Sequence, residues 1–382
     1  MAWPYFPEAE IEWILNEFRT ILRGEGVLSM GAHVSEFEKE FAGYIGSSFA
    51  VGTNSCSAAL EIALRSIGLR PGEEVIVPVE TFIATGAAVV REGGQPVFAE
   101  ISPETFCLTL RSIQEKVTDK TRAVIIVHMA GLVTPEIFAM RAFCDERGLV
   151  LIEDAAHAPG AGIDGKKAGS LGHIGCFSFF PTKIMTTAEG GMMVTSDQEI
   201  YRKANSYRNR GLDFDASSEQ YIGIGTNNRM TEIAAIMGRS QLRYLDEFVT
   251  RRNEVASVYN DAIISSGLGI YCKAIAAPAG ITHSYWRYLV LLDGSINREE
   301  LKGLMKEDGI PIDWAYYPPL HLQPVFAVLY GNRKGMLPRS EEILEHHVCL
   351  PMHACLESSD ATFIAERFLD NIRSLVHQKG TA

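Results

Sequence analysis

The chain has 382 residues, 47% hydrophobic and 21% charged, which is typical of a folded globular protein large enough for more than one core. Its 35 basic and 47 acidic residues give a formal charge of −12, which argues against a nucleic-acid-binding protein. Apolar stretches such as 123–127 are too short to span a membrane, the N-terminus lacks a secretory pattern, and the seven cysteines form no C-x-x-C pair. We therefore expect a cytoplasmic protein without a metal site or disulfide framework.

The first two thirds of the chain alternate between short apolar runs and helical patterns. Apolar residues at helical spacing predict helices over 8–24 and 35–45. Further along, strands are predicted at 49–52, 75–77, 96–98, 123–127 and 149–152, and helices at 58–67, 81–91 and 135–147. Short apolar strands separated by helices form βαβ units, so we predict an α/β core with a mostly parallel, buried sheet.

The pattern changes after about residue 245. A long helix is predicted over 242–264, a half-exposed alternating strand over 285–292, and helices near 298–308 and 358–376. This mixture predicts a large domain over 1–245 and a smaller α+β domain over 246–382, with the N-terminal helix free to pack on the small domain.

The run Gly52-Thr-Asn-Ser-Cys-Ser-Ala-Ala-Leu60 closes a predicted strand and opens a helix. Small side chains there let backbone amides approach an anion, and the helix dipole favours a phosphate at that end. The simpler interpretation is that Asn54, Ser55 or Ser57 only caps the helix, which such residues often do.

Asp154 follows the apolar strand Val150-Leu-Ile-Glu153, where a carboxylate can point into a crevice and pair with a cation such as a protonated pyridine nitrogen. A turn or capping role is the alternative. His157 lies three residues further on and, taken alone, fits a structural hydrogen-bonding histidine better than a catalytic one.

Lys183 follows the apolar aromatic run Cys176-Phe-Ser-Phe-Phe-Pro-Thr182 and precedes another apolar run at 192–194. Lysines normally lie on exposed faces, so this position is unusual unless the lysine is simply a surface residue. Burial lowers the pKa of a lysine, and only the neutral amine attacks a carbonyl.

Together these features fit one ligand. A phosphate cradle, an aspartate for a pyridinium nitrogen and a lysine for an aldehyde are what pyridoxal 5′-phosphate requires. Phe82 could supply an aromatic face for the ring, unless it is a core residue of its helix.

The chain resembles the DegT/DnrJ/EryC1/StrS family of sugar aminotransferases, within fold type I of the pyridoxal phosphate enzymes, from about residue 9 to 370. The motifs that carry the resemblance are 52–60, Pro78-Val-Glu-Thr-Phe-Ile-Ala-Thr85, Glu153-Asp-Ala-Ala-His-Ala158, Gly169-Ser-Leu-Gly172, 176–183, Glu189-Gly-Gly191, Gly225-Thr-Asn-Asn-Arg-Met-Thr-Glu232 and Tyr317-Pro-Pro-Leu-His-Leu-Gln-Pro324. It implies an aspartate-aminotransferase-like fold, whose large domain holds a mostly parallel seven-stranded sheet between helices.

The resemblance also implies a role for each matching residue. Lys183 would hold the cofactor as a Schiff base and then move a proton, while Asp154 would keep the pyridine nitrogen protonated. His157 would approach the phenolic oxygen of the ring, where many relatives have Gln, and Phe82 would stack on the ring. Cys56, Ser57 and Ser178 would bind the phosphate, and Asn227 would reach the phosphate of the neighbouring subunit in a homodimer with shared sites.

The implied activity is transfer of an amino group from L-glutamate to a keto sugar, in amino-sugar and polysaccharide biosynthesis, with the cofactor passing through its pyridoxamine form. The stretch 183–191 favours a nucleotide-linked 4-keto-6-deoxyhexose as acceptor. Cys56, Asn228 and the segment 129–132 depart from the commonest family pattern, and the last two put the substrate in doubt.

Several alternatives stay open. They are a 3-keto-sugar or cyclitol aminotransferase, a sugar dehydratase of the same family (whose members carry His in place of Lys183), and a non-catalytic sensor or regulator with this fold. A nicotinamide-dependent enzyme ranks last, because no G-x-G-x-x-G follows the first strand. Glu80, Arg229, Tyr317 and His321 are candidate substrate residues, although surface charge or domain packing explains them equally well.

Overall fold

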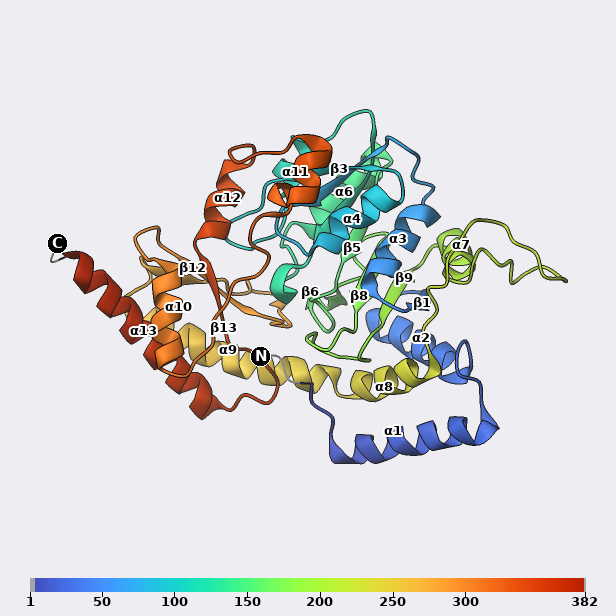
Figure 1. The fold of residues 1–382 in the computed structure, drawn as a ribbon, viewed down its shortest axis with the longest axis horizontal. Helices are drawn as coiled ribbons and strands as arrows, with labels where there is room; N and C mark the ends of the chain where they lie inside the picture. Colours follow the sequence, from blue (N-terminus) through green and yellow to red (C-terminus); the bar gives the residue numbers. More distant parts are fainter. Residues whose placement is uncertain (1–3, 381–382) are drawn as a thin grey trace.

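The computed structural model describes residues 4–380 and is built around a seven-stranded sheet in the order β1-β9-β8-β5-β4-β2-β3 (Figure 1). Only β9 runs antiparallel to its neighbours, β1 and β8. The predicted mostly parallel α/β sheet is therefore confirmed. The strands are β1 (Phe49–Thr53), β2 (Glu74–Pro78), β3 (Gln95–Ala99), β4 (Thr121–Val127), β5 (Val150–Asp154), β8 (Ile174–Ser178) and β9 (Gly191–Thr195).

Helices cover both faces of this sheet, because its strands are apolar on both sides. In β4, Ala123 and Ile125 pack into one core with α3 and α4, whereas Val124 and Ile126 pack into the other with α2, α6 and α8. Such two-sided burial is what makes a parallel strand read as a continuous apolar run. The helices of this part are α2 (Ala32–Ile45), α3 (Cys56–Ser66), α4 (Ile83–Arg91), α5 (Leu110–Gln114), α6 (Ile137–Arg147), α7 (Gln198–Arg208) and α8 (Glu232–Arg243).

A second, smaller sheet lies in the C-terminal part of the chain, in the order β10-β12-β13 with antiparallel pairing. Helix α9 follows α8 directly and leads into this part, where α10 and α13 lie beside the small sheet (Figure 1). The elements are α9 (Leu245–Ser265), β10 (Cys272–Ala274), β12 (Tyr288–Leu292), α10 (Arg298–Glu307), α11 (Pro324–Tyr330), α12 (Pro338–Glu345), β13 (His347–Leu350) and α13 (Ser358–Gly380).

The expectation that the strand over 285–292 is half-exposed was wrong. Strand β12 begins at Tyr288, and every residue in it except Leu291 is buried. The reason is its central position: Tyr288 and Val290 pack into the core formed with α9 and α13, while Leu289 packs on the opposite side against the core of the large sheet.

The N-terminal helix α1 (Glu8–Thr20) continues into a π-helical turn (Ile21–Glu25) and packs on α8, where Arg243 pairs with Glu10. The expected long helix over 242–264 is interrupted at Tyr244, between α8 and α9. The remaining short elements are β6 (Gly162–Ile163), β7 (Lys166–Lys167), β11 (Ile281–Thr282) and the 3₁₀ turns Met129–Gly131 and Leu320–Leu322. Among residues 4–380, no helix is both long and apolar enough to cross a membrane.

Candidate active site

A cavity of about 430 Å³ opens where the parallel strands of the large sheet end. Ligands of open α/β sheets bind at this edge. Val127, Asp154 and Ser178 close β4, β5 and β8 and line the cavity, together with the start of α3 and the turn between β8 and β9. The cavity brings together the predicted residues Cys56, Ser57, Phe82, Asp154, His157, Ser178 and Lys183.

Lys183 projects from the turn between β8 and β9 into this cavity. Its Nζ lies 4.2 Å from the centroid of the Trp286 ring. Burial lowers the pKa of Lys183 to about 8, although the nearby charge of Asp154 acts in the opposite direction. With this pKa about a tenth of the amine is neutral at pH 7, and the neutral amine is the form that attacks a carbonyl.

Asp154 ends β5 and is buried beside the cavity. Its Oδ2 accepts a 2.8 Å hydrogen bond from the Thr85 hydroxyl, and Oδ1 accepts one of 3.2 Å from the Ala156 amide. Burial raises the pKa of Asp154, which these hydrogen bonds and the charge of Lys183 oppose. A cation placed against this carboxylate would stabilise its charge, because the hydrogen bonds compensate only part of the cost of desolvation.

Glu153 precedes Asp154 on the same strand but points to the other face, as alternation along a strand requires. It accepts hydrogen bonds of 2.7 Å from the backbone amides of Gly169 and Leu171, and His128 Nε2 lies 2.7 Å from its Oε2. Glu153 therefore holds the 169–172 motif in place and leaves Asp154 as the acid of this strand that faces the cavity.

His157 lies in a stack of aromatic rings. Its ring is parallel to Trp286, with centroids 3.8 Å apart and an angle of 11° between planes. Its Nε2 lies 2.8 Å from the Tyr316 hydroxyl, whereas Nδ1 is buried without a hydrogen-bond partner within residues 4–380. Burial lowers the pKa of His157 well below its ordinary value, so the ring is neutral and Nδ1 is left for a ligand.

The N-terminus of α3 forms one end of the cavity. Ser55 caps the helix, since its hydroxyl accepts a 3.2 Å hydrogen bond from the Ala58 amide, and Cys56 and Ser57 are the first helical residues. A Cβ added at Gly191 would lie 2.4 Å from the Ser55 carbonyl carbon, so only glycine lets β9 approach this helix end so closely. Free amide groups at such an end are suited to a phosphate.

None of the four predicted substrate residues, Glu80, Arg229, Tyr317 and His321, lines this cavity. Glu80 is fully buried behind it, without a hydrogen-bond partner in the described chain, and burial raises the pKa of its carboxyl well above the usual range. His321 is also buried, and its Nε2 lies 3.0 Å from Glu341, while the Tyr317 ring carries the Arg298 guanidinium at 4.3 Å. The geometry of Tyr317 and His321 is that of packing contacts.

Asn227 and Arg229 also lie outside the cavity of their own chain. Asn227 is exposed, and its carbonyl oxygen is 3.5 Å from the Asn54 side-chain nitrogen. Arg229 donates a 2.6 Å hydrogen bond to the Asn209 side chain. Both residues belong to the segment that follows α7. Part of this segment extends away from the body of the molecule (Figure 1), whereas Arg229 pairs with Thr53 at the end of β1.

Four residues that shape the cavity were not predicted from the sequence: Thr85, Trp286, Arg287 and Tyr316. Thr85 stands in a motif that was recognised, but nothing in the sequence paired it with Asp154. The other three come from the C-terminal part of the chain, and Tyr316 also faces Phe82, with ring centroids 6.0 Å apart. The available signal was the aromatic content near 285–288 and 314–317.

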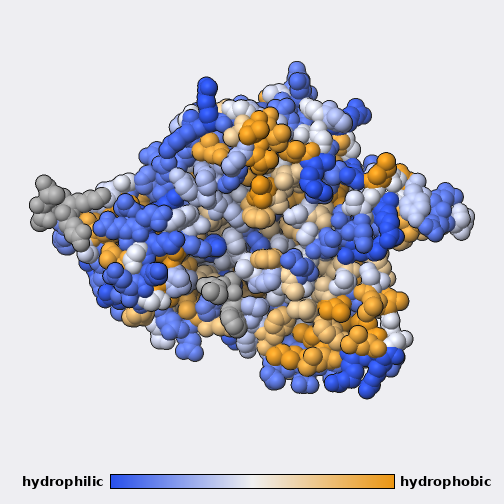
Figure 2. Space-filling view, in the orientation of Figure 1, coloured by the Kyte–Doolittle hydropathy of each residue, from blue (hydrophilic) through white to orange (hydrophobic). Residues whose placement is uncertain are grey.

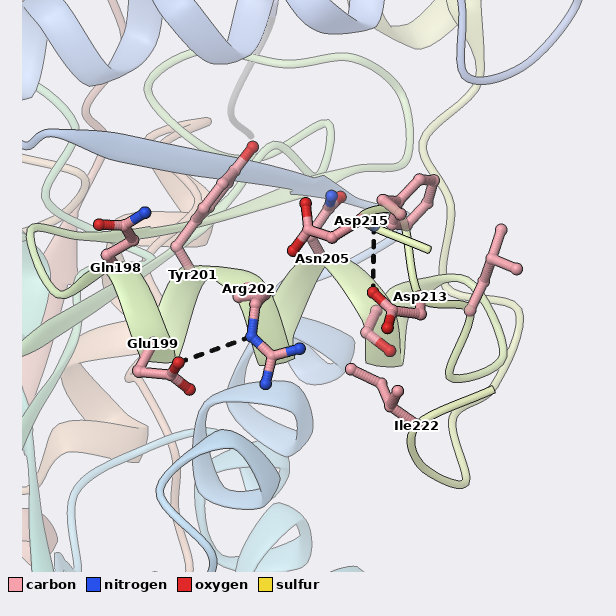
Figure 3. A pocket seen from close by; sticks show the side chains of 11 residues that line it. Gln198, Glu199, Tyr201, Arg202, Asn205, Asp213, Asp215 and Ile222 are labelled. Carbon is pink, nitrogen blue, oxygen red and sulfur yellow. Dashed lines mark hydrogen bonds and ion pairs between the residues drawn. The ribbon is translucent and has the colours of Figure 1, made fainter. Parts of the chain in front are cut away.

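A larger cavity of about 560 Å³ lies elsewhere, between α7 and the segment 212–222 (Figure 3). Its walls are mostly polar, and Glu199 and Arg202 form an ion pair of 3.6 Å on one turn of α7. None of the predicted catalytic or cofactor-binding residues lines it. Size alone therefore does not identify the candidate active site.

The fold places the molecule in the class of fold type I sugar aminotransferases. The crystal structure of the aminotransferase TlmJ from Streptoalloteichus hindustanus superposes with a TM-score of 0.88 at 29% identity, over 98% of this chain and 99% of that one. The chain belongs to the DegT/DnrJ/EryC1/StrS aminotransferase family, whose model matches residues 8–369. It is therefore a transaminase of a family that depends on pyridoxal phosphate.

Two similar proteins carry names that state different functions. The chain is 35% identical to the UDP-N-acetyl-3-dehydro-alpha-D-glucosamine 3-aminotransferase of Acidithiobacillus ferrooxidans, covering 88% of each chain. It is 34% identical to a protein of Geobacillus stearothermophilus named pleiotropic regulatory protein, covering 95% of each. The names of its relatives support an amino-sugar aminotransferase and leave the specific substrate open.

Proposed function

We propose that this protein uses pyridoxal 5′-phosphate bound at Lys183 to transfer the amino group of L-glutamate to a nucleotide-linked keto sugar. The observation that carries the proposal is the pairing of a buried lysine, with a pKa of about 8, and a buried aspartate in one cavity at the strand ends.

Three features of the cavity fit this cofactor. The amine of Lys183 is suited to its aldehyde, and the under-compensated Asp154 carboxylate is suited to its pyridinium nitrogen. The unpartnered Nδ1 of His157 is suited to its phenolic oxygen. Cys56 and Ser57 at the start of α3, with Ser178, would hold the phosphate, and Phe82 would cover the ring.

When bound, the cofactor supplies an electron-withdrawing ring that stabilises negative charge on the substrate carbon. The protein would supply the proton transfers: the Lys183 amine, when free and neutral, would act as the base that removes the proton from the substrate carbon. Its lowered pKa suits this role at neutral pH. Asp154 would keep a proton on the ring nitrogen, and the aromatic stack of His157 and Trp286 fixes the position of the histidine.

The working unit in this proposal is a homodimer with shared sites. The segment after α7 exposes Phe214, Tyr221, Ile222 and Ile224, and it carries Asn227. Figure 2 shows a second group of apolar side chains around α1, where Leu15, Leu22, Val27 and Leu28 are exposed. Burying these surfaces against a second copy would bring Asn227 to the phosphate of the neighbouring subunit.

The acceptor is proposed to be a 4-keto-6-deoxyhexose nucleotide, because the stretch 183–191 resembles members of the family that aminate C4. A 3-keto sugar nucleotide is the second candidate, favoured by the 35% identity to a 3-aminotransferase. A cyclitol would lack the nucleotide altogether. A panel of keto-sugar nucleotides and keto-cyclitols, with products analysed by mass spectrometry and NMR, separates these cases.

The basic test is the absorbance spectrum of the protein supplied with pyridoxal phosphate, before and after excess L-glutamate, beside Lys183→Ala. We expect a visible band in the wild type that is lost with glutamate, and no such band in Lys183→Ala. A protein that stays colourless would refute the proposal and favour the regulator suggested by the name of the Geobacillus relative. Loss of the sugar hydroxyl instead of amination would favour the dehydratase.

A further inference from the structure

The hydroxyl of Tyr316 reaches His157 in the wall of the candidate active site. Both residues line the cavity, and the Tyr316 hydroxyl oxygen lies 2.8 Å from His157 Nε2. His157 follows β5, whereas Tyr316 lies between α10 and α11, so the C-terminal part of the chain supplies this contact. The hydrogen bond therefore joins two parts of the chain at the cavity.

His157 is a neutral ring, and a neutral imidazole carries its single proton on one of its two nitrogens. Burial, together with the charges of Lys183 and Arg287, lowers the pKa of His157 well below its ordinary value. Its Nδ1 is buried and has no hydrogen-bond partner within residues 4–380. Whether Nδ1 is a donor or an acceptor therefore decides what the ring can bind, and the hydrogen bond at Nε2 sets this choice.

Ring stacking and the hydrogen bond together fix which nitrogen faces Tyr316. The His157 ring lies parallel to Trp286, with centroids 3.8 Å apart, and within 13° of the plane of the Tyr316 ring. Turning the imidazole over would keep these stacks but would move Nε2 away from the tyrosine hydroxyl. Nε2 therefore stays with Tyr316, and Nδ1 is the nitrogen left for a ligand.

A count of donors and acceptors distinguishes the two tautomers. With the proton on Nδ1, the Tyr316 hydroxyl donates to Nε2, and the Nδ1–H group alone is left without a partner among the described residues. With the proton on Nε2, both the hydroxyl proton and the Nδ1 lone pair lack a partner in the same part of the chain. Unpaired buried polar groups are costly, so the first arrangement is favoured. Burial also raises the pKa of Tyr316 well above its ordinary value, so its hydroxyl keeps the proton that it donates.

We propose that Tyr316 is a positioning residue whose hydroxyl donates to His157 Nε2 and so keeps the ring proton on Nδ1, as a donor to the phenolic oxygen of the cofactor. The proposal rests on the proposed function, because it concerns how that cofactor is bound. An ionised phenolic oxygen accepts hydrogen bonds, so an Nδ1–H group stabilises it, whereas the lone pair of the other tautomer would repel it.

A glutamine at position 157, which many relatives have, gives the sharpest comparison. A glutamine amide always carries its donors on nitrogen, so it needs no neighbour to set a tautomer. Tyr316→Phe should therefore impair the wild type but have little effect in His157→Gln. The matched control is Tyr259→Phe, because Tyr259 is a buried tyrosine of the C-terminal core that donates a 2.9 Å hydrogen bond to the Pro351 carbonyl.

The first readout is the tautomer itself. In the full chain labelled with ¹⁵N-histidine, two-bond proton–nitrogen spectra show which ring nitrogen carries the proton. The signal of His157, one of ten histidines, is the one absent from His157→Gln. We expect the Nδ1–H tautomer in the wild type and in Tyr259→Phe, with and without pyridoxal phosphate. Cofactor-free Tyr316→Phe should show the Nε2–H tautomer or a mixture of both.

The second readout is the affinity for pyridoxal phosphate, measured by absorbance titration. Tyr316→Phe should weaken binding about fivefold when residue 157 is histidine, as expected for loss of one hydrogen bond. In His157→Gln the same substitution should change binding by less than about twofold, and Tyr259→Phe should leave it unchanged. Thermal unfolding of each variant shows that it is folded.

Three results would overturn the inference alone. They are an Nε2–H tautomer in the wild type, an unchanged Nδ1–H tautomer in Tyr316→Phe, and an equal loss of cofactor affinity in both backgrounds, which would assign Tyr316 to ring packing. A wild-type protein that shows the Nδ1–H tautomer but binds no pyridoxal phosphate would instead refute the proposed function, and this inference with it.

Discussion

Burial of Lys183 predicts how fast the protein takes up its cofactor at each pH. With a pKa of about 8, about 9% of the amine is neutral at pH 7, against roughly 0.03% for a lysine with the ordinary value. Since only the neutral amine attacks an aldehyde, this difference is worth about 300-fold in rate at pH 7. The rate should rise about tenfold between pH 7 and pH 9 and then level off.

The assay mixes cofactor-free protein with pyridoxal phosphate in a stopped-flow instrument and follows the visible band between pH 6 and pH 11. Nα-acetyl-lysine under the same conditions corrects for titration of the aldehyde itself. Asp154→Asn is the informative variant, because the charge of Asp154 raises the pKa of Lys183. Its removal should move the midpoint of the profile below that of the wild type.

A wild-type profile that keeps rising beyond pH 10 in parallel with Nα-acetyl-lysine would refute this reasoning. It would mean that the amine is solvated before the cofactor arrives and that burial does not tune it. A midpoint that rises in Asp154→Asn would contradict the assigned sign of the aspartate's effect and leave the burial argument intact.

Three further outcomes follow from the same geometry. Gly191→Ala should destabilise the fold by about 1–3 kcal/mol and impair cofactor uptake, because the added Cβ would collide with the start of α3. Gly303→Ala is the control and should not destabilise the fold, because nothing lies within 4 Å of its added Cβ. Thermal unfolding compares the two variants. Tyr316→Phe keeps the ring but removes the hydrogen bond to His157, and should weaken pyridoxal phosphate binding about fivefold in an absorbance titration. Burial raises the pKa of Glu80, so the folded protein loses stability as pH rises above the unfolded value near 4.3. Glu80→Gln should therefore be more stable than the wild type at pH 7, with a gain that shrinks towards pH 4 in urea unfolding. A pH-independent difference would show that Glu80 does not titrate as inferred.

The core of the fold could be predicted because its strands are buried on both faces. The apolar run at 123–127 is one example: each residue faces one of two cores, so no polar alternation interrupts the pattern. The predicted strands at 75–77 and 149–152 correspond to β2 and β5 within two residues at each end. The strand near 285–292 was misread because a central strand of a small sheet can be buried by two different cores, which its own pattern does not reveal.

Glu80 and Asp154 show why the side of a strand end cannot be predicted in the same way. Each is an acidic residue at the end of an apolar strand: Glu80 follows β2 by two residues, and Asp154 is the last residue of β5. Asp154 faces the cavity and accepts a hydrogen bond from Thr85, whereas the Glu80 carboxyl group is buried with no hydrogen-bond partner in the described chain. The difference depends on the turn geometry after each strand and on side chains far away in sequence.

The division of the cavity between two parts of the chain explains why chemistry was easier to predict than specificity. The residues proposed to hold the cofactor come from strand ends and the start of α3, and the local sequence pattern predicts where these strands end and where this helix begins. Trp286, Arg287 and Tyr316 reach the same cavity from more than 100 residues beyond Lys183, because the C-terminal sheet packs back on the large one. Those three side chains are the part of the cavity lining that comes from the C-terminal part of the chain, so we expect substitutions there to change substrate preference. Relatives named for amination at C3 and at C4 match this chain at 35% and 31% identity, so overall identity does not decide the acceptor. Exchanging Trp286 or Tyr316 should therefore alter the ratio of acceptors used in the panel, while leaving the visible band of the cofactor-loaded protein in place.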